Sequence, residues 1–247
     1  MQHFDLDKEN INNLTSLWKL MGITPNQELN AQGIYRSRSW PHRYWQDWDS
    51  RTTFKERLGN TPLDRKKLVV PVFQNNSKKD IQQQSDKEGL GLSLLFKQQA
   101  MYLDMYNYTP QAQQQLNITK VTSEKDTIVW CNIASQAFNY EIDVASIILA
   151  NQHPEVTLLL ADMQGQPVAT AMLHKTEHVT GIHQMGVPEQ YRGQGVARNL
   201  MHQVLGLTKR ELACRYAVLQ ASSAGESLYL SLGFKAQFTI ENYMFVD

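Results

Sequence analysis

The sequence contains little that would support disulfide chemistry, a metal site or a membrane span. Its 247 residues include only two cysteines, Cys131 and Cys214, too few for a disulfide framework or for the spacing of a zinc site. Both lie in apolar patterns, so we predict small core residues in a reducing compartment. No apolar run approaches the ~20 residues that cross a bilayer. We therefore expect no metal and no membrane partner.

An excess of charge of either sign is also missing. Lysine plus arginine and aspartate plus glutamate number 24 each, so no whole-chain field attracts nucleic acid or an anionic membrane. The first residues, Met1 to Asp5, are too acidic and too interrupted for a signal peptide. The expectation is a cytoplasmic protein that does not bind nucleic acid.

One short glycine-rich stretch lies where a strand pattern gives way to a helix pattern. Pro188 cannot donate to a sheet ladder, so the apolar strand before it is expected to end there. Gly193 and Gly195 lack a Cβ, so the loop can turn tightly and bring backbone N–H groups close to a bulky anion. Helical periodicity begins at Val196. Because the amides of a helix N-terminus are open, this stretch predicts a phosphate-binding loop.

The glycine pattern is Gln190-x-x-Gly193-x-Gly195. It lacks the Lys-Ser/Thr of a nucleotide P-loop and the third glycine of a dinucleotide-binding fold. It resembles the pyrophosphate loop of the GNAT superfamily of N-acetyltransferases, whose pattern is Gln/Arg-x-x-Gly-x-Gly/Ala. An ordinary glycine-rich turn before a helix is the alternative for the motif alone.

The predicted order of elements in the C-terminal half supports the same resemblance. A capping box, Ser223-x-x-Glu226, begins a short helix that Gly233 ends. The segment 219–222 followed by Leu228-Tyr229-x-x-Leu232-Gly233-Phe234 is similar to the second signature region of the superfamily. The periodicities predict, in order, a strand at 116–121, helices at 123–139 and 142–150, strands at 156–161, 168–174 and 179–187, a helix from 196, a strand at 216–220, the short helix and a last strand ending near 245.

The resemblance covers about residues 116–246 and implies an α/β protein with a mixed, α+β type sheet, the GNAT acyl-CoA N-acyltransferase fold. We place this domain at 113–247. Residues 1–112 are predicted to form a smaller N-terminal α/β region that faintly resembles a degenerate GNAT half without its glycine loop. The boundary is the polar, glutamine-rich segment around Pro110.

The N-terminal region carries no motif. A helix is predicted over residues 8–21, and strands at 67–73 and 90–96 are expected to pair as a hairpin with a long connection. The stretch 34–48 interleaves aromatic and basic residues. It predicts a helix from Pro41 that buries its aromatic side chains, with base stacking on nucleic acid or the lining of an acceptor pocket as alternatives.

The resemblance implies transfer of an acetyl group from acetyl-coenzyme A, as co-substrate, to a bound amine that attacks directly in a ternary complex. The backbone of Met185 and Val187 would pair with the pantetheine arm as an added strand does. Loop amides would bind the pyrophosphate. These amides belong to Arg192, Gly193, Gln194, Gly195, Val196 and Ala197.

Two further residues are candidates from the second signature region. Tyr229 matches the family tyrosine that stands beside the coenzyme sulfur, which predicts a general acid; a buried core aromatic is the alternative. Ser222 follows the adjacent strand and is predicted to contact pantetheine, unless it only begins the helix.

The base that removes the amine proton is not identified by any motif. Glu177, His178 and His183 lie on or near the strand that leads into the loop, and His183 is the tentative choice because histidine titrates in the required range. His178 and His183 should face opposite ways unless a bulge intervenes. Glu189 is expected outside the site, and a water chain is the alternative base.

Acetyl transfer to an amine, with a small molecule or a protein amine as acceptor, is the leading functional interpretation. A non-catalytic acyl-coenzyme A-binding sensor, in which the N-terminal half closes the acceptor channel, is the alternative from another class. An RNA-modifying acyltransferase would need an exposed basic surface near residues 36–51.

Overall fold

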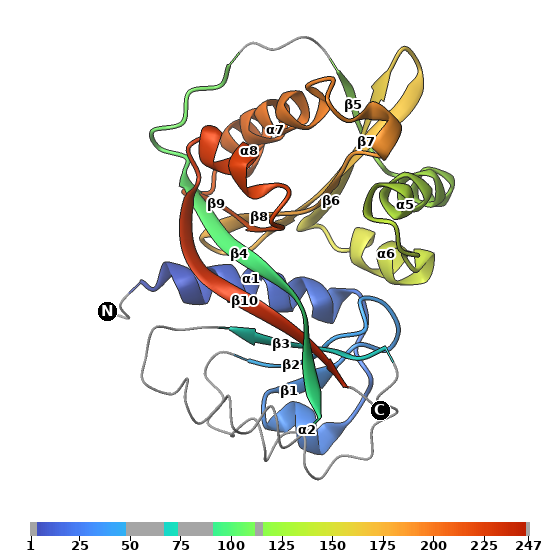
Figure 1. The fold of residues 1–247 in the computed structure, drawn as a ribbon, viewed down its shortest axis with the longest axis vertical. Coiled ribbons are helices and arrows are strands. Elements are labelled where there is room, and N and C mark those ends of the chain that lie inside the picture. The colour runs from blue at the N-terminus through green and yellow to red at the C-terminus, as the bar shows by residue number, and fades with distance from the viewer. Residues whose placement is uncertain (1–3, 48–66, 74–90, 112–115, 246–247) are drawn as a thin grey trace.

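The computed structural model describes residues 4–47, 67–73, 91–111 and 116–245. Within these ranges the chain forms a mixed α/β structure around one large sheet (Figure 1). The helices are α1 (Leu6–Leu20), α2 (Gln27–Ala31), α5 (Glu124–Phe138), α6 (Val144–Asn151), α7 (Val196–Leu207) and α8 (Glu226–Ser231), with short turns η1 (Glu189–Tyr191) and η2 (Thr208–Leu212). The strands are β1 (Ile34–Arg36), β2 (Tyr44–Gln46), β3 (Val69–Phe73), β4 (Leu92–Asp104), β5 (Asn117–Lys120), β6 (Val156–Met163), β7 (Gln166–Lys175), β8 (Val179–Gly186), β9 (Tyr216–Ala221) and β10 (Lys235–Phe245).

The large sheet has eight strands among the described residues, in the order β3-β10-β4-β9-β8-β7-β6-β5. Its neighbours pair antiparallel except β8 and β9, which run parallel. The predicted α/β class with a mixed sheet is confirmed, and so is the order of elements after residue 116.

The sheet runs across the predicted boundary near residue 112. Strand β4, from the N-terminal side, lies between β9 and β10 and pairs with both. Figure 1 shows β4 and β10 as long neighbouring strands that extend from the C-terminal helices to the N-terminal small sheet. The division into 1–112 and 113–247 stays a prediction, but the C-terminal residues obtain one strand of their sheet from the first part.

Helices cover both faces of the sheet. Successive residues of a strand point to opposite faces, and apolar side chains on each face pack against the helices there. On β7, Ala171 belongs to the core beneath α7, whereas Met172 belongs to the core shared by α1, α5 and α6. Helix α7 buries one apolar stripe that includes Leu200 and Val204. The first core thus supports the glycine motif, and the second joins the N-terminal helix to the C-terminal helices.

Two N-terminal predictions are wrong. Strands β3 and β4 do not pair as a hairpin, since both pair with β10, one on each side. Residues after Pro41 do not form a helix: β2 pairs with β1 in a separate two-stranded sheet. Tyr44 and Trp45 are nevertheless fully buried, as predicted, because the strand packs them inward against α1 and β3. Trp48, predicted to be buried with them, lies outside the described residues.

A side-chain cap is present at α5 and absent at α8, where one was predicted. Ser123 is the N-cap of α5, and its hydroxyl accepts the Asp126 amide. The predicted box of Ser223 and Glu226 does not form, because α8 begins at Gly225 without a side-chain cap. The Ser222 carbonyl instead accepts the amides of Gly225 and Glu226. No helix in the described part of the chain is long and apolar enough to cross a membrane.

Candidate active site

The glycine loop, residues 192–197, follows β8 and the turn η1 and begins α7. Gly193 and Gly195 have φ of 74° and 76°, in the left-handed region that favours glycine. A Cβ built on either would meet no heavy atom within 4 Å, so the space beside the loop is open. Gly195 is the N-cap of α7 and no side chain caps it. The loop therefore fits a bulky anion bound by backbone amides.

Arg192 differs from the rest of the loop. Its amide donates to the Glu189 carbonyl at 3.1 Å and closes the turn before the glycines. Its guanidinium donates to the carbonyls of Val187 at 2.9 Å and Ala137 at 2.8 Å. These bonds attach the loop to the end of β8 and to α5. Arg192 thus holds the loop in place, and amide binding of an anion rests mainly on residues 193–197.

Next to the loop, β8 and β9 separate. They pair only from Val179 to Gly181 on β8 and from Tyr216 to Val218 on β9. Beyond this point the pairing of β8 with β7 is irregular. Thr170 and Met172 of β7 pair with Gly186 and His183 of β8, and Gln184, between these two β8 residues, has a φ of 47°. The facing edges of the two strands are left without strand partners there.

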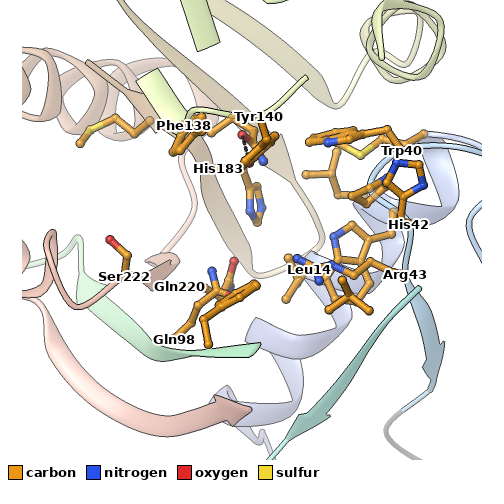
Figure 2. A pocket seen from close by; sticks show the side chains of 18 of the residues that line it. Leu14, Trp40, His42, Arg43, Gln98, Phe138, Tyr140, His183, Gln220 and Ser222 are labelled. Atoms are coloured by element: carbon orange, nitrogen blue, oxygen red, sulfur yellow. Dashed lines mark hydrogen bonds between the residues drawn. The ribbon is translucent and has the colours of Figure 1, made fainter. Parts of the chain in front are cut away.

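A cavity of about 810 Å³ lies between the separated strands. Strand β8 lines it with residues 182–185, and β9 with Leu219 and Gln220. In Figure 2, Ser222 lies at one end, His42 and Arg43 at the other, and His183 between them. The structure thereby brings four predicted site residues together, Met185, His183, Ser222 and Tyr229. Val187 and the glycine loop are not among its lining residues.

Tyr229 reaches the cavity from α8 and is only 9% exposed. Its ring contacts Phe234 edge-to-face. Burial raises the pKa of its hydroxyl to about 12, so the group keeps its proton at neutral pH. A protonated phenol beside an open strand edge can donate to a developing anion. Ser222, where β9 passes into α8, lines the same end of the cavity.

His183 lies in the middle of the cavity wall, and its ring is held by α1. The Nε2 atom pairs with Asn13 Oδ1 at 2.9 Å, which makes Nε2 the donor. Burial lowers the pKa of His183 to about 3, with His174 adding to the shift, so the imidazole is neutral near pH 7. A Cβ at Gly181 would collide with both Asn13 Oδ1 and His183 Nε2, so this pair requires glycine there.

The other predicted base candidates lie elsewhere. Glu177 Oε1 and His178 Nε2 lie 3.8 Å apart, and both residues are exposed. His178 also packs edge-on against Phe4. Glu189, on η1, is exposed and is not a lining residue. His178 precedes β8 and is exposed, whereas His183 lies on β8 and is buried. That the two face opposite ways stays a prediction.

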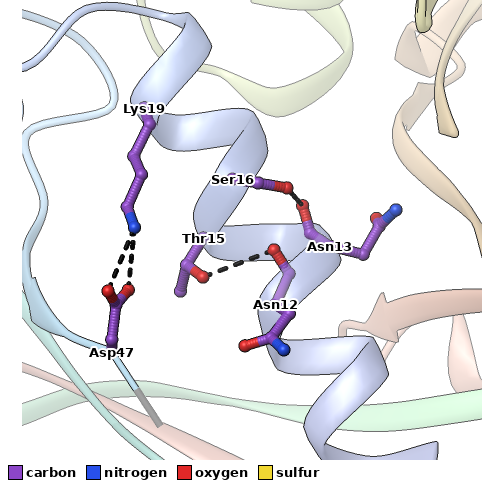
Figure 3. Close-up of polar contacts among 6 residues, drawn as sticks. All are labelled: Asn12, Asn13, Thr15, Ser16, Lys19 and Asp47. Atoms are coloured by element: carbon purple, nitrogen blue, oxygen red, sulfur yellow. Dashed lines mark hydrogen bonds and ion pairs between the residues drawn. The ribbon is translucent and has the colours of Figure 1, made fainter. Parts of the chain in front are cut away.

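Helix α1 closes the cavity on the side that the C-terminal residues leave open. Asn13 donates to the His174 carbonyl at 2.8 Å, and Ser16 Oγ contacts His174 Nε2 at 2.9 Å. Asn10 accepts from Gln220 at 2.7 Å. Figure 3 shows the polar side of α1, including the ion pair of Lys19 with Asp47 that ties the helix to the end of β2 at 2.9 Å.

Sequence reasoning missed most of this N-terminal contribution. We call the cavity-lining residues of α1 and of the segment 39–43 the N-terminal wall: Leu14, Leu17, Trp18, Met21, Ser39, Trp40, Pro41, His42 and Arg43. The only signal was the aromatic and basic stretch at 34–48, for which an acceptor pocket was one interpretation. Asn10 and Asn13 carried no signal, since asparagines on an amphipathic helix usually face solvent.

Comparison with known proteins agrees with this geometry. Residues 154–236 match the family model of the acetyltransferase (GNAT) domain, a range that includes β6 to α8 and the glycine loop. These residues therefore carry a GNAT acetyltransferase domain. No curated protein matches the sequence significantly.

Solved structures share the fold at low identity. A GCN5-related N-acetyltransferase from Kribbella flavida is 17% identical with a TM-score of 0.57, covering 73% of this chain and 68% of that one. A protein from Novosphingobium aromaticivorans, assigned to the GNAT family of acetyltransferases, is 12% identical with a TM-score of 0.64, covering 99% and 100%. A GCN5-related N-acetyltransferase from Sphaerobacter thermophilus is 19% identical with a TM-score of 0.56, covering 71% and 59%. The fold is that of GNAT proteins, while descent of the N-terminal half from a GNAT unit stays a prediction.

Proposed function

We propose that this protein is an N-acetyltransferase that moves an acetyl group from acetyl-coenzyme A to an amine in a ternary complex. The observation that carries the proposal is the separation of β8 from β9, because the cavity that Tyr229 also lines lies between these strands, and β8 leads through η1 into a glycine loop that no side chain caps. Acetyl-coenzyme A supplies the activated acetyl thioester. The reaction needs no nucleophilic side chain, because placing the amine and the thioester together supplies much of the rate.

The chain's own groups have separate roles in binding. Amides of the glycine loop bind the pyrophosphate at the positive end of α7, with Arg192 holding the loop to Val187 and Ala137. The open edge of β8, through Met185 and Val187, receives the pantetheine arm in the manner of an added strand. Ser222 contacts the same arm from the β9 side. A backbone N–H of β8 stabilises the negative charge that develops on the carbonyl oxygen.

Proton transfer completes the exchange of bonds. The amine nitrogen bonds to the acetyl carbon, the carbon–sulfur bond breaks, and the departing thiolate takes a proton from Tyr229. The proton that the nitrogen loses on forming the amide then restores the Tyr229 hydroxyl. An amine with a pKa near ~10 must first lose a proton. His183 is the candidate base inside the cavity, although its pKa of about 3 makes it a weak acceptor. Water is the alternative route. The free, buried cysteines suit the cytoplasmic location that forms part of the proposal.

Calorimetric titration with acetyl-coenzyme A, followed by a thiol-release assay over a panel of amines, tests the proposal. Micromolar binding together with amine-dependent thiol release is the expected result. Binding without release for any amine would indicate a coenzyme sensor, and absence of binding would contradict the proposal altogether.

A further inference from the structure

A single arginine lies at the end of the cavity away from Ser222. Arg43 precedes β2, and its backbone is fixed by two bonds to Ser37: its amide donates to Ser37 Oγ at 3.0 Å, and its carbonyl accepts the Ser37 amide at 2.8 Å. The side chain lines the cavity beside His42 and Trp40 (Figure 2). The small N-terminal sheet therefore fixes the backbone of Arg43, and no ion pair of the guanidinium is needed for this.

The charge of Arg43 is not balanced within the part of the chain that the structure describes. Its Nε and Nη1 atoms are sealed from solvent and have no hydrogen-bond partner, and no described carboxylate forms an ion pair with it. Burial lowers the pKa of the guanidinium to about 10, against the influence of Tyr140, so it remains charged at neutral pH. The residue as a whole is half-buried, and Nη2 is not among the sealed atoms, so a ligand in the cavity can reach the guanidinium there. A shielded charge without a partner destabilises a fold, a cost that proteins tolerate at functional sites.

Neighbouring aromatic rings hold the guanidinium without neutralising it. Its central carbon lies 5.6 Å from the ring centre of Trp18 and 5.7 Å from that of Phe96. Cation–π contacts of this kind orient an arginine and stabilise it modestly. These contacts leave the hydrogen-bond donors of the guanidinium unused, because a ring face does not replace the acceptor that each N–H group requires.

Two carboxylate residues line the cavity, and one of them, Asp143, is already engaged. Asp143 is the N-cap of α6 and accepts from the hydroxyls of Ser146 at 2.7 Å and Ser39 at 2.9 Å. Burial alone would raise its pKa, but these hydrogen bonds lower it, so Asp143 stays ionised. Glu141, also a lining residue, is exposed to solvent. An anion that pairs with Arg43 must therefore come from outside the described chain.

We propose that Arg43 binds a carboxylate of the acceptor, so that the substrate is a small amine that also carries a carboxylate and an apolar body, such as an apolar amino acid. This assignment rests on the proposed acetyl transfer and deepens it. The cavity volume is that of a small-molecule site. Trp18, Trp40 and Leu14 also line the cavity and offer apolar surface.

A monoanion suits the site better than a phosphate. One guanidinium balances one carboxylate, whereas a phosphate monoester carries about −1.5 to −2 charges near pH 7. The excess would face the ionised Asp143. Of the other basic residues that line the cavity, Lys67 is exposed to solvent, and burial together with Lys67 and Arg43 lowers the pKa of His42. The acceptor carboxylate is thus expected to be the only anion that the site takes.

Direct binding in the absence of acetyl-coenzyme A tests the assignment. The probes are the twenty common L-amino acids, their carboxamides and phosphoethanolamine. Their binding is measured by calorimetry and by the fluorescence of the protein's tryptophans. The variants are Arg43→Met, which keeps length but removes charge, Arg43→Lys, which keeps charge, and Arg38→Met, an exposed matched control.

The expected result is an apolar amino acid that binds at least about 10-fold more tightly than its carboxamide, as charge-assisted hydrogen bonds imply. Arg43→Met removes this preference, Arg43→Lys keeps part of it, and Arg38→Met leaves it unchanged. Removing an unpaired buried charge should also raise the Tm of Arg43→Met by about 2–4 °C.

Four results would overturn the assignment: binding by no amino acid, equal binding of acid and carboxamide, a preference that survives Arg43→Met, or tightest binding of phosphoethanolamine. Failure of acetyl transfer is recognised separately. Acetyl-coenzyme A binding and thiol release are measured on the wild type, and they test the proposed function whether or not the carboxylate preference is found.

Discussion

The glycine loop and the N-terminal wall, which we propose are the two ends of one site, would act by different physical means. The loop acts through backbone amides, which Gly193 and Gly195 expose by adopting positive φ beside open space. The wall acts through side chains whose positions depend on packing, on the Asn13–His183 contact and on the uncompensated charge of Arg43. A site made of backbone amides thus requires particular residue types, such as glycine, within one short segment. A site made of side chains is instead assembled from segments that are far apart in the sequence.

The largest expected effect concerns the loop alone. Gly195→Asp places a carboxylate where the pyrophosphate binds, and two unit charges 4 Å apart repel by about 4 kcal/mol near a protein surface. We expect affinity for acetyl-coenzyme A to fall at least about 100-fold in calorimetry. Gly165→Asp is the matched control, because Gly165 also has a positive φ, 78°, and open space around it. Equal losses in both variants would refute the loop assignment.

Tyr229→Phe separates chemistry from binding. Loss of the hydroxyl is expected to lower kcat by about 100-fold, a usual contribution of a general acid, while coenzyme affinity changes little. Tyr106→Phe, at a position 83% exposed, serves as the control. Stopped-flow measurement of thiol release gives the chemical step. A wild-type rate in Tyr229→Phe with chemistry limiting would remove Tyr229 from the mechanism.

Gly181→Ala challenges the attachment of the wall to the sheet. The added methyl group would collide with Asn13 and His183, so we expect the free energy of unfolding to fall by about 1–3 kcal/mol. Gly206→Ala is the comparison, since its methyl group would meet only the flexible end of Arg210 within a helix. Urea denaturation measures both. A Gly181→Ala variant as stable as the wild type would show that the contact is loose.

The pH profile of kcat/KM tests whether His183 is the base. With a pKa of about 3, the ring should not titrate between pH 5 and 8, and the rate should follow deprotonation of the amine. We therefore expect no inflection in that range for the wild type or for His183→Gln. An inflection that the variant loses would identify His183 as the titrating base.

Acid should weaken the wall before the loop. His174 and His183 have pKa values lowered by burial to about 4 and about 3, and both contact α1. In the unfolded chain both histidines bind protons below their ordinary pKa of 6.5. Their contribution to the stability of the fold is therefore fully present above that pH and is lost as the pH falls toward 4. Each histidine contributes a slope of up to about 1.4 kcal/mol per pH unit. His174→Gln should flatten the slope of urea-measured stability, and an unchanged slope would contradict this.

The glycine loop and the C-terminal order of elements could be predicted because local rules determine them. Pro188, the two glycines and the apolar stripe of α7 each restrict the backbone or the buried face. The insertion of β4 between β9 and β10 could not, because pairing between strands far apart in sequence leaves no local pattern. The predicted capping box of Ser223 and Glu226 was wrong, because the Ser222 carbonyl already accepts the first amides of α8.

The N-terminal wall was unpredictable for a related reason. Aromatic residues around Tyr44 and Trp45 fit the buried side of either a short helix or a strand, and only packing against α1 and β3 decides between them. Asn13 is buried because His183 and the His174 carbonyl satisfy it, and both partners are far away in the chain.

Amide chemical-shift mapping on the protein during titration with coenzyme A tests the central claim most directly. We predict large shifts for the amides of Gly193, Gln194, Gly195, Val196 and Ala197 and for Met185 on the open edge of β8, with little change at Arg43. Shifts confined to the N-terminal wall, or an unperturbed glycine loop in a saturated complex, would contradict the account.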